Sequence, residues 1–191
     1  FASFKQDSAE LNELQNSYKQ RKEEISSLKK QIGYFEVIRS QNSVTNTKVK
    51  TLDSTIKTLY AVISGEKGEK RDWDRFNYLF TEDARLIPTG KNKEGEIGYR
   101  IMKPQEYVEN SGKWLEENGF FEVEIFRKTE RYGTICHIFS TYESRRSASD
   151  EKPFARGINS IQLLHDGKRW KIMHVYWMGE SEEFPLQAKY L

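Results

Sequence analysis

The chain has 191 residues and a mass of 22.5 kDa, and its formal net charge at pH 7 is +2. Charges of both signs are nearly balanced, so the sequence carries no electrostatic footprint for nucleic acid. No apolar run is long enough to predict a membrane span. Hydrophobic residues make up 36% and charged residues 31% of the chain, which suits one domain with a solvated appendage.

The chain contains a single cysteine, Cys136, so an internal disulfide is excluded and the cysteine count leaves the compartment open. We expect Cys136 to pack as a small hydrophobic residue. The sequence begins with Phe1, which fits a mature secreted or periplasmic protein or a trimmed chain, and does not exclude the cytoplasm. The histidines do not form a cluster with ligand spacing, so neither a metal site nor a cofactor is predicted.

Residues 8–39 have the pattern of one long helix, and we predict an N-terminal helical region over 1–42. Its apolar residues follow alternating three- and four-residue steps, which is a coiled-coil pattern. This seam consists of Leu11, Leu14, Tyr18, Ile25, Leu28, Ile32 and Phe35, with Arg21 as the one interruption. The seam can pair with another copy or dock on the chain's own globular part, and the pattern fits both. A polar linker is predicted over 43–50.

The globular part, 51–191, is predicted to begin with three helices. The first presents one apolar face over 52–63, the second follows Asp72, a good N-cap residue, and the third begins at Pro104, where a missing N–H costs nothing. Its end is expected at Asn118, because Gly119 follows. Two short strands are expected among these helices, at Ala84–Thr89 and Ile97–Met102.

The rest of the chain is predicted to be an antiparallel sheet made of the runs Phe120–Arg131, Thr134–Arg145 and Phe154–Met178. Asp166-Gly167 in the last run predicts a hairpin, since a two-residue turn needs positive φ at both central positions. A hairpin turn fixes the register of its strands. With this two-residue loop, His174 lies opposite Asn159 and Tyr176 lies opposite Gly157.

These registers predict a polar layer on the buried face of the sheet, formed by Ser140, Asn159 and His174, next to a layer with Tyr142 and Tyr176. The same registers turn Arg127 toward this face, and turn Glu122 and Glu124 toward water. A few polar groups on an apolar wall are typical of a small-molecule pocket. The alternative is that the polar groups only hydrogen-bond to one another inside a solid core.

The stretch Asp72–Phe76 with Leu79-Phe80, and the run Asp83–Pro88, resemble the second helix and first strand of the nuclear transport factor 2-like superfamily. Its members include ketosteroid isomerases, scytalone dehydratase and SnoaL-like polyketide cyclases. The stretches 137–145, 157–163 and 166–170 are similar to an uncharacterised bacterial branch of that superfamily. The resemblance implies an α+β, cystatin-like cone of three helices on a curved antiparallel sheet. It also implies a conical pocket and a homodimer formed through the outer sheet face.

The resemblance does not imply an activity, because this fold hosts enzymes and non-enzymes alike. In the isomerase branch a catalytic aspartate stands just before the Pro-x-Gly turn, and Ile87 occupies that place here, so that chemistry is not carried over. Our hypothesis for a general base is His174, because the pKa of histidine lies near neutrality. The binding residues predicted beside it are Ser140, Tyr142, Asn159, Tyr176 and Arg127.

Two alternatives stay open for Arg127, which either anchors a ligand carboxylate or extends outward at the sheet edge. Two function classes also stay open. The first is a pocket domain that binds a small apolar molecule carrying a polar group, and either only binds it or also isomerises, dehydrates or hydrolyses it. The second is a non-catalytic module that assembles through the N-terminal helix and the outer sheet face. Whether the chain is an enzyme is left undecided.

Overall fold

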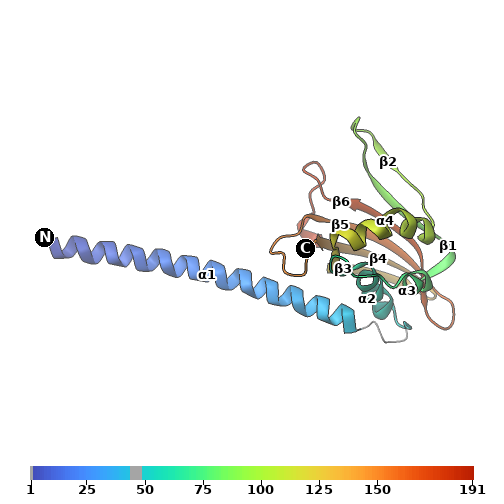
Figure 1. Cartoon of the computed structure of the whole chain (residues 1–191), viewed down its shortest axis with the longest axis horizontal. Helices are drawn as coiled ribbons and strands as arrows, with labels where there is room; N and C mark the ends of the chain where they lie inside the picture. Colours follow the sequence, from blue (N-terminus) through green and yellow to red (C-terminus); the bar gives the residue numbers. More distant parts are fainter. Residues whose placement is uncertain (1, 44–48) are drawn as a thin grey trace. The chain divides into compact units, whose positions relative to one another are not determined.

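The structure is a computed structural model that describes the backbone of residues 2–43 and 49–191 and the side chains of residues 11–37 and 49–191. The chain divides into two compact units, 1–37 and 38–191. Each unit is described by itself below (Figure 1). Most of the predicted linker, 43–50, lies outside the described residues.

The first unit belongs to a single long helix, α1 (Ala2–Ser43), which extends beyond the 8–39 pattern at both ends and lies within one residue of the predicted helical region, 1–42. The helix continues because Pro is absent from its sequence and Gly33 is its only glycine. Large apolar side chains of the seam are exposed along its length, from Leu11 at 57% to Phe35 at 47%. In the described range 11–37, α1 therefore presents an uncovered apolar stripe.

Three helices open the second unit, and their bounds agree closely with the prediction: α2 (Leu52–Ile63), α3 (Trp73–Tyr78) and α4 (Pro104–Asn118). Thr51 caps α2 by accepting a hydrogen bond from the Ser54 amide at 3.1 Å. Asp72 caps α3 in the same way through the Arg75 amide, at 2.9 Å. These caps satisfy backbone N–H groups that have no partner inside the helix.

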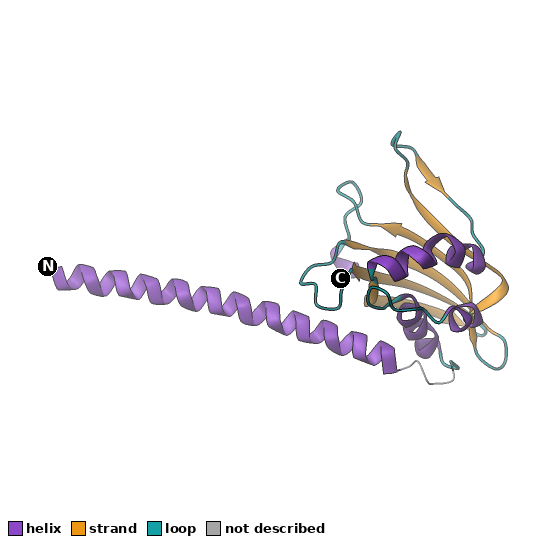
Figure 2. Cartoon of the chain, viewed as in Figure 1, coloured by secondary structure: helices purple, strands orange, loops and turns teal. Residues whose placement is uncertain are grey.

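Six strands form one curved sheet, which the three helices cover on one face (Figure 2). The strands are β1 (Phe80–Lys91), β2 (Ile97–Tyr99), β3 (Phe121–Tyr132), β4 (Ile135–Arg145), β5 (Ala155–His165) and β6 (Trp170–Gly179). Their order is β2-β1-β6-β5-β4-β3, and all neighbours are antiparallel except β1 and β6. The predicted α+β architecture is confirmed.

The register of β5 and β6 differs from the prediction. The loop spans four residues, 166–169, and Met173 is an extra, bulged residue between Ile172, opposite Leu163, and His174, opposite Gln162. A bulge adds one residue to one strand and so reverses which side chains face inward beyond it. Trp177, rather than His174, therefore lies opposite Asn159, and the prediction for His174 is wrong.

The same bulge corrects the prediction for Tyr176. Tyr176 lies opposite Ser160 rather than Gly157, and it is 47% exposed. Its side chain lines a hollow on the outer sheet face together with Phe139 and Ser160. The side chains of His174 and Tyr176 thus do not lie on the inner sheet face, where the sequence analysis had placed them.

A second bulge corrects the orientation of β3. Glu124 pairs with Tyr142 and Phe126 pairs with Thr141, so Ile125 is the extra residue. Arg127 lies opposite Ser140. Since the bulge reverses the alternation, Glu122 and Glu124 lie on the inner face with Arg127, and the prediction that both glutamates face water is wrong.

The outer face of the sheet is covered in part by the C-terminal segment that follows β6. The Thr141 hydroxyl donates a hydrogen bond to the Tyr190 carbonyl at 2.7 Å, and Thr141 is fully buried. The Tyr190 ring packs against Phe139 and Phe126, with ring centroids 5.2 and 6.4 Å away. A short 3₁₀ turn, η2 (Ala188–Tyr190), holds this ring in place.

Candidate functional site

A cavity of about 250 Å³ lies between the helices and the inner face of the sheet. All three helices contribute apolar side chains to it, and the sheet contributes both apolar and polar ones. Its walls include Leu59, Phe76, Tyr107, Tyr142, Val175 and Trp177. The polar groups on its wall are concentrated at Glu122, Ser144 and Asn159, on three adjacent strands. An apolar cavity with a few converging polar groups is the usual form of a small-molecule site.

Glu122 is the carboxyl group of this cavity. Its Oε2 accepts a hydrogen bond from the Ser144 hydroxyl at 3.0 Å, and its Oε1 accepts a longer one from the Asn159 amide at 3.4 Å. Burial raises the pKa of Glu122 from 4.5 to about 7, and the two hydrogen bonds oppose that rise. A carboxyl group with a pKa near neutrality can both accept and donate a proton at physiological pH.

Two tyrosines, Tyr107 and Tyr142, line the cavity together with this glutamate. Burial, and to a lesser degree the charge of Glu122, raises the pKa of both Tyr107 and Tyr142 above the ordinary value of 10. Both phenols therefore keep their protons at neutral pH, and they can donate hydrogen bonds to an oxygen in the cavity.

A chain of hydrogen bonds runs behind the cavity wall through buried side chains. The Asn159 amide donates to the Tyr60 hydroxyl at 3.1 Å, and that hydroxyl lies 2.7 Å from the Ser140 hydroxyl. Ser140 in turn donates to Glu124 at 2.5 Å. Because Asn159 and Ser140 both act as donors, the Tyr60 proton points to Ser140. The chain holds the Asn159 amide in place for its second contact, with Glu122.

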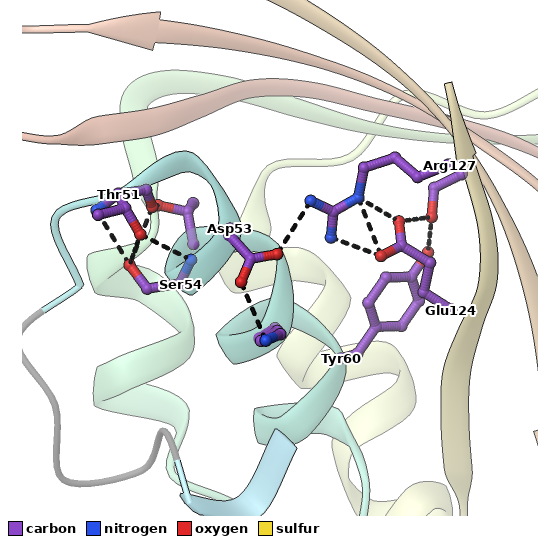
Figure 3. Close-up of polar contacts among 9 residues, drawn as sticks. Thr51, Asp53, Ser54, Tyr60, Glu124 and Arg127 are labelled. Atoms are coloured by element: carbon purple, nitrogen blue, oxygen red, sulfur yellow. Dashed lines mark hydrogen bonds and ion pairs between the residues drawn. The ribbon is translucent and has the colours of Figure 1, made fainter. Parts of the chain in front are cut away.

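Arg127 closes this chain at the edge of the sheet. Its guanidinium binds Glu124 through Nε at 2.8 Å and Asp53 through Nη1 at 3.2 Å, and it lies between the two carboxylates (Figure 3). Its side chain is 19% exposed. Arg127 does not line the cavity; it neutralises Glu124, which leaves Glu122 as the carboxyl group without a cationic partner among its hydrogen-bond donors.

The structure therefore brings together part of the predicted set of site residues. Tyr142 and Asn159 line the cavity, while Ser140 lies directly behind its wall. His174 and Tyr176 lie elsewhere, for the reason given above. The sequence reasoning missed Glu122, and the available signal was weak, because Phe121 and Val123 on the other side of the strand are also buried. Alternation cannot orient a strand that is covered on both sides.

The outer face has a second hollow, of about 300 Å³, between the sheet and the C-terminal segment. Its lining includes Phe139, Tyr176, Phe184 and Leu186, and its acidic group, Glu180, is held by an ion pair with Arg156 at 2.8 Å. We therefore place the candidate site at the inner cavity, where the carboxyl group faces open space.

Among the described residues, no group of three or more acidic, histidine or cysteine side chains could hold a metal ion, and no described helix could cross a membrane.

Comparison with known proteins gives similarity of structure only. The chain matches no protein-family model and no curated protein. A protein of unknown function from Mycobacterium tuberculosis is similar with a TM-score of 0.51 and 14% identity, over 72% of this chain and 79% of that one. A candidate calcium/calmodulin-dependent protein kinase type II association domain from Thiobacillus denitrificans has a TM-score of 0.51 and 9% identity, over 73% and 98%.

Other similar structures include a protein of unknown function with a cystatin-like fold from Nostoc punctiforme, with a TM-score of 0.49 and 12% identity, over 71% of this chain and 97% of that one. At these identities the likeness is one of fold, and it carries no activity. The globular part of the chain therefore shares its fold with the structures from Mycobacterium tuberculosis and Thiobacillus denitrificans.

Proposed function

We propose that the globular part binds a small, mainly apolar molecule in the inner cavity and that Glu122 exchanges a proton with its polar group. The observation that carries this proposal is the position of the Glu122 carboxyl group on the wall of an otherwise largely apolar cavity. Its neighbours there are neutral hydrogen-bond donors, Ser144 and Asn159. A carboxyl group in such surroundings is suited to general acid–base chemistry.

The size of the cavity limits the ligand. At about 250 Å³ it is slightly below the range of about 300–1,000 Å³ that holds drug-sized molecules. A ligand of one ring, or a short chain with one oxygen function, fits this space. The rings of Phe76, Tyr107 and Trp177 would cover the apolar part of the ligand. The hydroxyls of Tyr107 and Tyr142 would donate hydrogen bonds to an oxygen of the ligand.

The reactions that this arrangement supports are isomerisation, dehydration and hydrolysis, because each needs one group that takes and returns a proton. The carboxylate would come from β3, whereas the isomerase branch uses an aspartate at the place where this chain has Ile87. Ile87 lies on β1, opposite Tyr176. The proposed base is thus a different residue on a different strand, and no reaction is carried over from the isomerases.

The proposal is tested with p-cresol and toluene, which differ in one hydroxyl group, by NMR of the labelled protein. We expect p-cresol to bind more tightly than toluene, and its advantage to grow as the pH rises through about 7, because the phenol donates to the ionised Glu122. The variant Glu122→Leu should lose this difference. Glu130→Gln, on an exposed part of the same strand, is the control and should keep it.

Two results would contradict the proposal. One is equal affinity for p-cresol and toluene in the wild-type protein at every pH. The other is an unchanged p-cresol advantage in Glu122→Leu. Carboxyl-carbon NMR of the glutamates adds a direct check, since p-cresol should lower the apparent pKa of Glu122 by stabilising its charged form.

A second candidate function, assembly of the chain into a homodimer, is favoured by the exposed seam of α1. The outer sheet face, which the resemblance implied as a dimer surface, is occupied in part by the chain's own Tyr190. Assembly through α1 is independent of the cavity, and both functions are compatible in one protein.

A further inference from the structure

The seam of α1 repeats with the period of a coiled coil. Between Leu11 and Phe35, eight positions are spaced alternately by three and four residues, and seven of them are apolar. In a heptad labelled abcdefg, Leu11, Tyr18, Ile25 and Ile32 take position a, and Leu14, Arg21, Leu28 and Phe35 take position d. All eight side chains are exposed in the structure. Such a stripe is stable in water only when a partner covers it.

The described part of the chain offers no helix that could match this seam. The seam is about 36 Å long at 1.5 Å per residue. The longest helix of the globular part, α4, has 15 residues and the next, α2, has 12. Both helices also present apolar side chains to the sheet, as Leu115 and Ile56 do at 2% and 0% exposure. The helix that matches α1 in length and spacing is α1 of a second copy.

The choice of residues in the seam indicates two parallel strands. Ile at position a with Leu at position d favours parallel dimers, and the middle of the seam reads Ile25, Leu28, Ile32. In a parallel pair, position g of one helix faces position e of the next heptad on its partner. This brings Glu24 of each copy next to Lys29 of the other, which forms the same attractive pair twice.

An antiparallel pair in the register that aligns the apolar positions is less favourable. In an antiparallel pair, position e of one helix faces position e of the other, and position g faces position g. Lys22 would then lie beside Lys22, and Glu24 beside Glu24, of the other copy. The antiparallel pair would also put Arg21 opposite Ile25 in two separate layers, whereas the parallel pair confines both arginines to one layer. A single polar layer in a seam lowers stability but fixes the register.

We propose that α1 forms a parallel, in-register, two-stranded coiled coil with α1 of a second copy of this chain. The chain is then a dimer held by its N-terminal helices, and each copy carries its own cavity. The Arg21 layer sets the register, and the two Glu24–Lys29 pairs set the direction. This inference does not depend on the function proposed for the cavity.

The oligomeric state of the full chain tests the proposal, measured by sedimentation velocity and light scattering over a concentration series. We expect a dimer that dissociates on dilution. Ile25→Asp should give a monomer at all concentrations, whereas Ser27→Asp, which adds the same charge on the outward side of the helix, should remain a dimer. The Ile25→Asp variant should keep the wild-type near-ultraviolet circular dichroism spectrum, which shows that the globular part is folded. A wild-type monomer, a trimer, or a dimer unaffected by Ile25→Asp would overturn the proposal.

Charge reversal tests the direction. Glu24→Lys and Lys29→Glu should each raise the dissociation constant several-fold, and the double variant should return it close to the wild-type value. These two residues are five apart, so they do not face each other within one helix. An antiparallel pair, or docking on the chain's own globular part, gives no such recovery, and absence of recovery would refute the parallel arrangement.

A cysteine cross-link gives an independent check. Leu14→Cys should form a disulfide-linked dimer on mild oxidation, because the parallel register places the two substituted positions in one layer. Ser27→Cys, which points outward, should not cross-link, and the buried Cys136 of the wild-type chain is the further control. Cross-linking of Ser27→Cys but not of Leu14→Cys would overturn the assignment of the seam.

Discussion

Replacing Glu122 by Gln should abolish a pH dependence of stability that the wild-type protein owes to this group. Burial raises the pKa of Glu122 from 4.5 to about 7. Since one pKa unit corresponds to about 1.4 kcal/mol, this rise in the pKa of Glu122 corresponds to roughly 3 kcal/mol. Because the carboxyl group faces a cavity that solvent can enter, we expect about 2–3 kcal/mol.

The sign follows from the protonation of the two states. Below about pH 4.5 the carboxyl group is protonated in the folded and in the unfolded chain. Between pH 4.5 and about 7 the unfolded chain loses this proton first, so the folded state binds more protons and the free energy of unfolding falls as the pH rises. Above about pH 7 both states are ionised and the loss is complete. Glutamine at position 122 cannot ionise, so the variant lacks this loss.

Urea unfolding followed by tryptophan fluorescence measures the effect. The free energy of unfolding of Glu122→Gln minus that of the wild type should grow by about 2–3 kcal/mol from pH 4.5 to pH 8. Glu130→Gln is the matched control on the same strand, since its exposed carboxylate binds Lys128 at 3.0 Å and its pKa is lowered. Parallel pH profiles of wild type and Glu122→Gln, or a difference of the opposite sign, would refute the assignment of Glu122 as a buried carboxyl group.

Three further predictions concern the surroundings of the cavity. Arg127→Met removes the counter-ion of Glu124 and should lower the free energy of unfolding by about 2 kcal/mol, as measured by urea unfolding, with Arg127→Lys intermediate. Gly157→Ala should cost about 1–3 kcal/mol and weaken p-cresol binding in the NMR titration, because the new Cβ would lie 2.5 Å from the Tyr142 hydroxyl. Removal of residues 181–191 should uncover the outer sheet face, so the fluorescence of added anilinonaphthalene sulfonate should rise and the melting temperature should fall. If the free energy of unfolding of Arg127→Met, the p-cresol affinity of Gly157→Ala, or the dye fluorescence of the shortened chain equals the wild-type value, the contact proposed at that position is contradicted.

The order and bounds of the elements were largely predictable from local chemistry. Asp72 and Pro104 mark helix starts, and both helices begin where these residues predict. Asp166-Gly167 marks a turn correctly, and Gly167 has a φ of +89°. The turn is longer than two residues because Asp166 also accepts hydrogen bonds from the amides of Lys168 and Arg169, both at 2.9 Å. The turn residues thus located the hairpin but not its register.

The position of the site was not predictable, because two bulges decide it. Ile125 and Met173 are the extra residues, and neither has a glycine or proline beside it to mark a break in the strand. Both side chains are partly exposed, at 40% and 39%, which is tolerable for a single large apolar residue. Nothing in the alternation of the sequence signals these insertions, and each one reverses the strand beyond it. In this way His174 is turned away from the inner face, and Glu122 and Glu124 are turned toward it.

The bulge at Ile125 also explains why one of two neighbouring glutamates is suited to proton transfer. In a regular strand, Glu124 and Arg127 are three residues apart and face opposite sides. With the extra residue they share the inner face, and the ion pair between them forms. Glu122, two residues earlier, reaches the same face, but its hydrogen-bond donors are the neutral Ser144 and Asn159. Glu124 therefore has a cationic partner, whereas Glu122 has none among its hydrogen-bond donors, and burial brings the pKa of Glu122 close to neutrality.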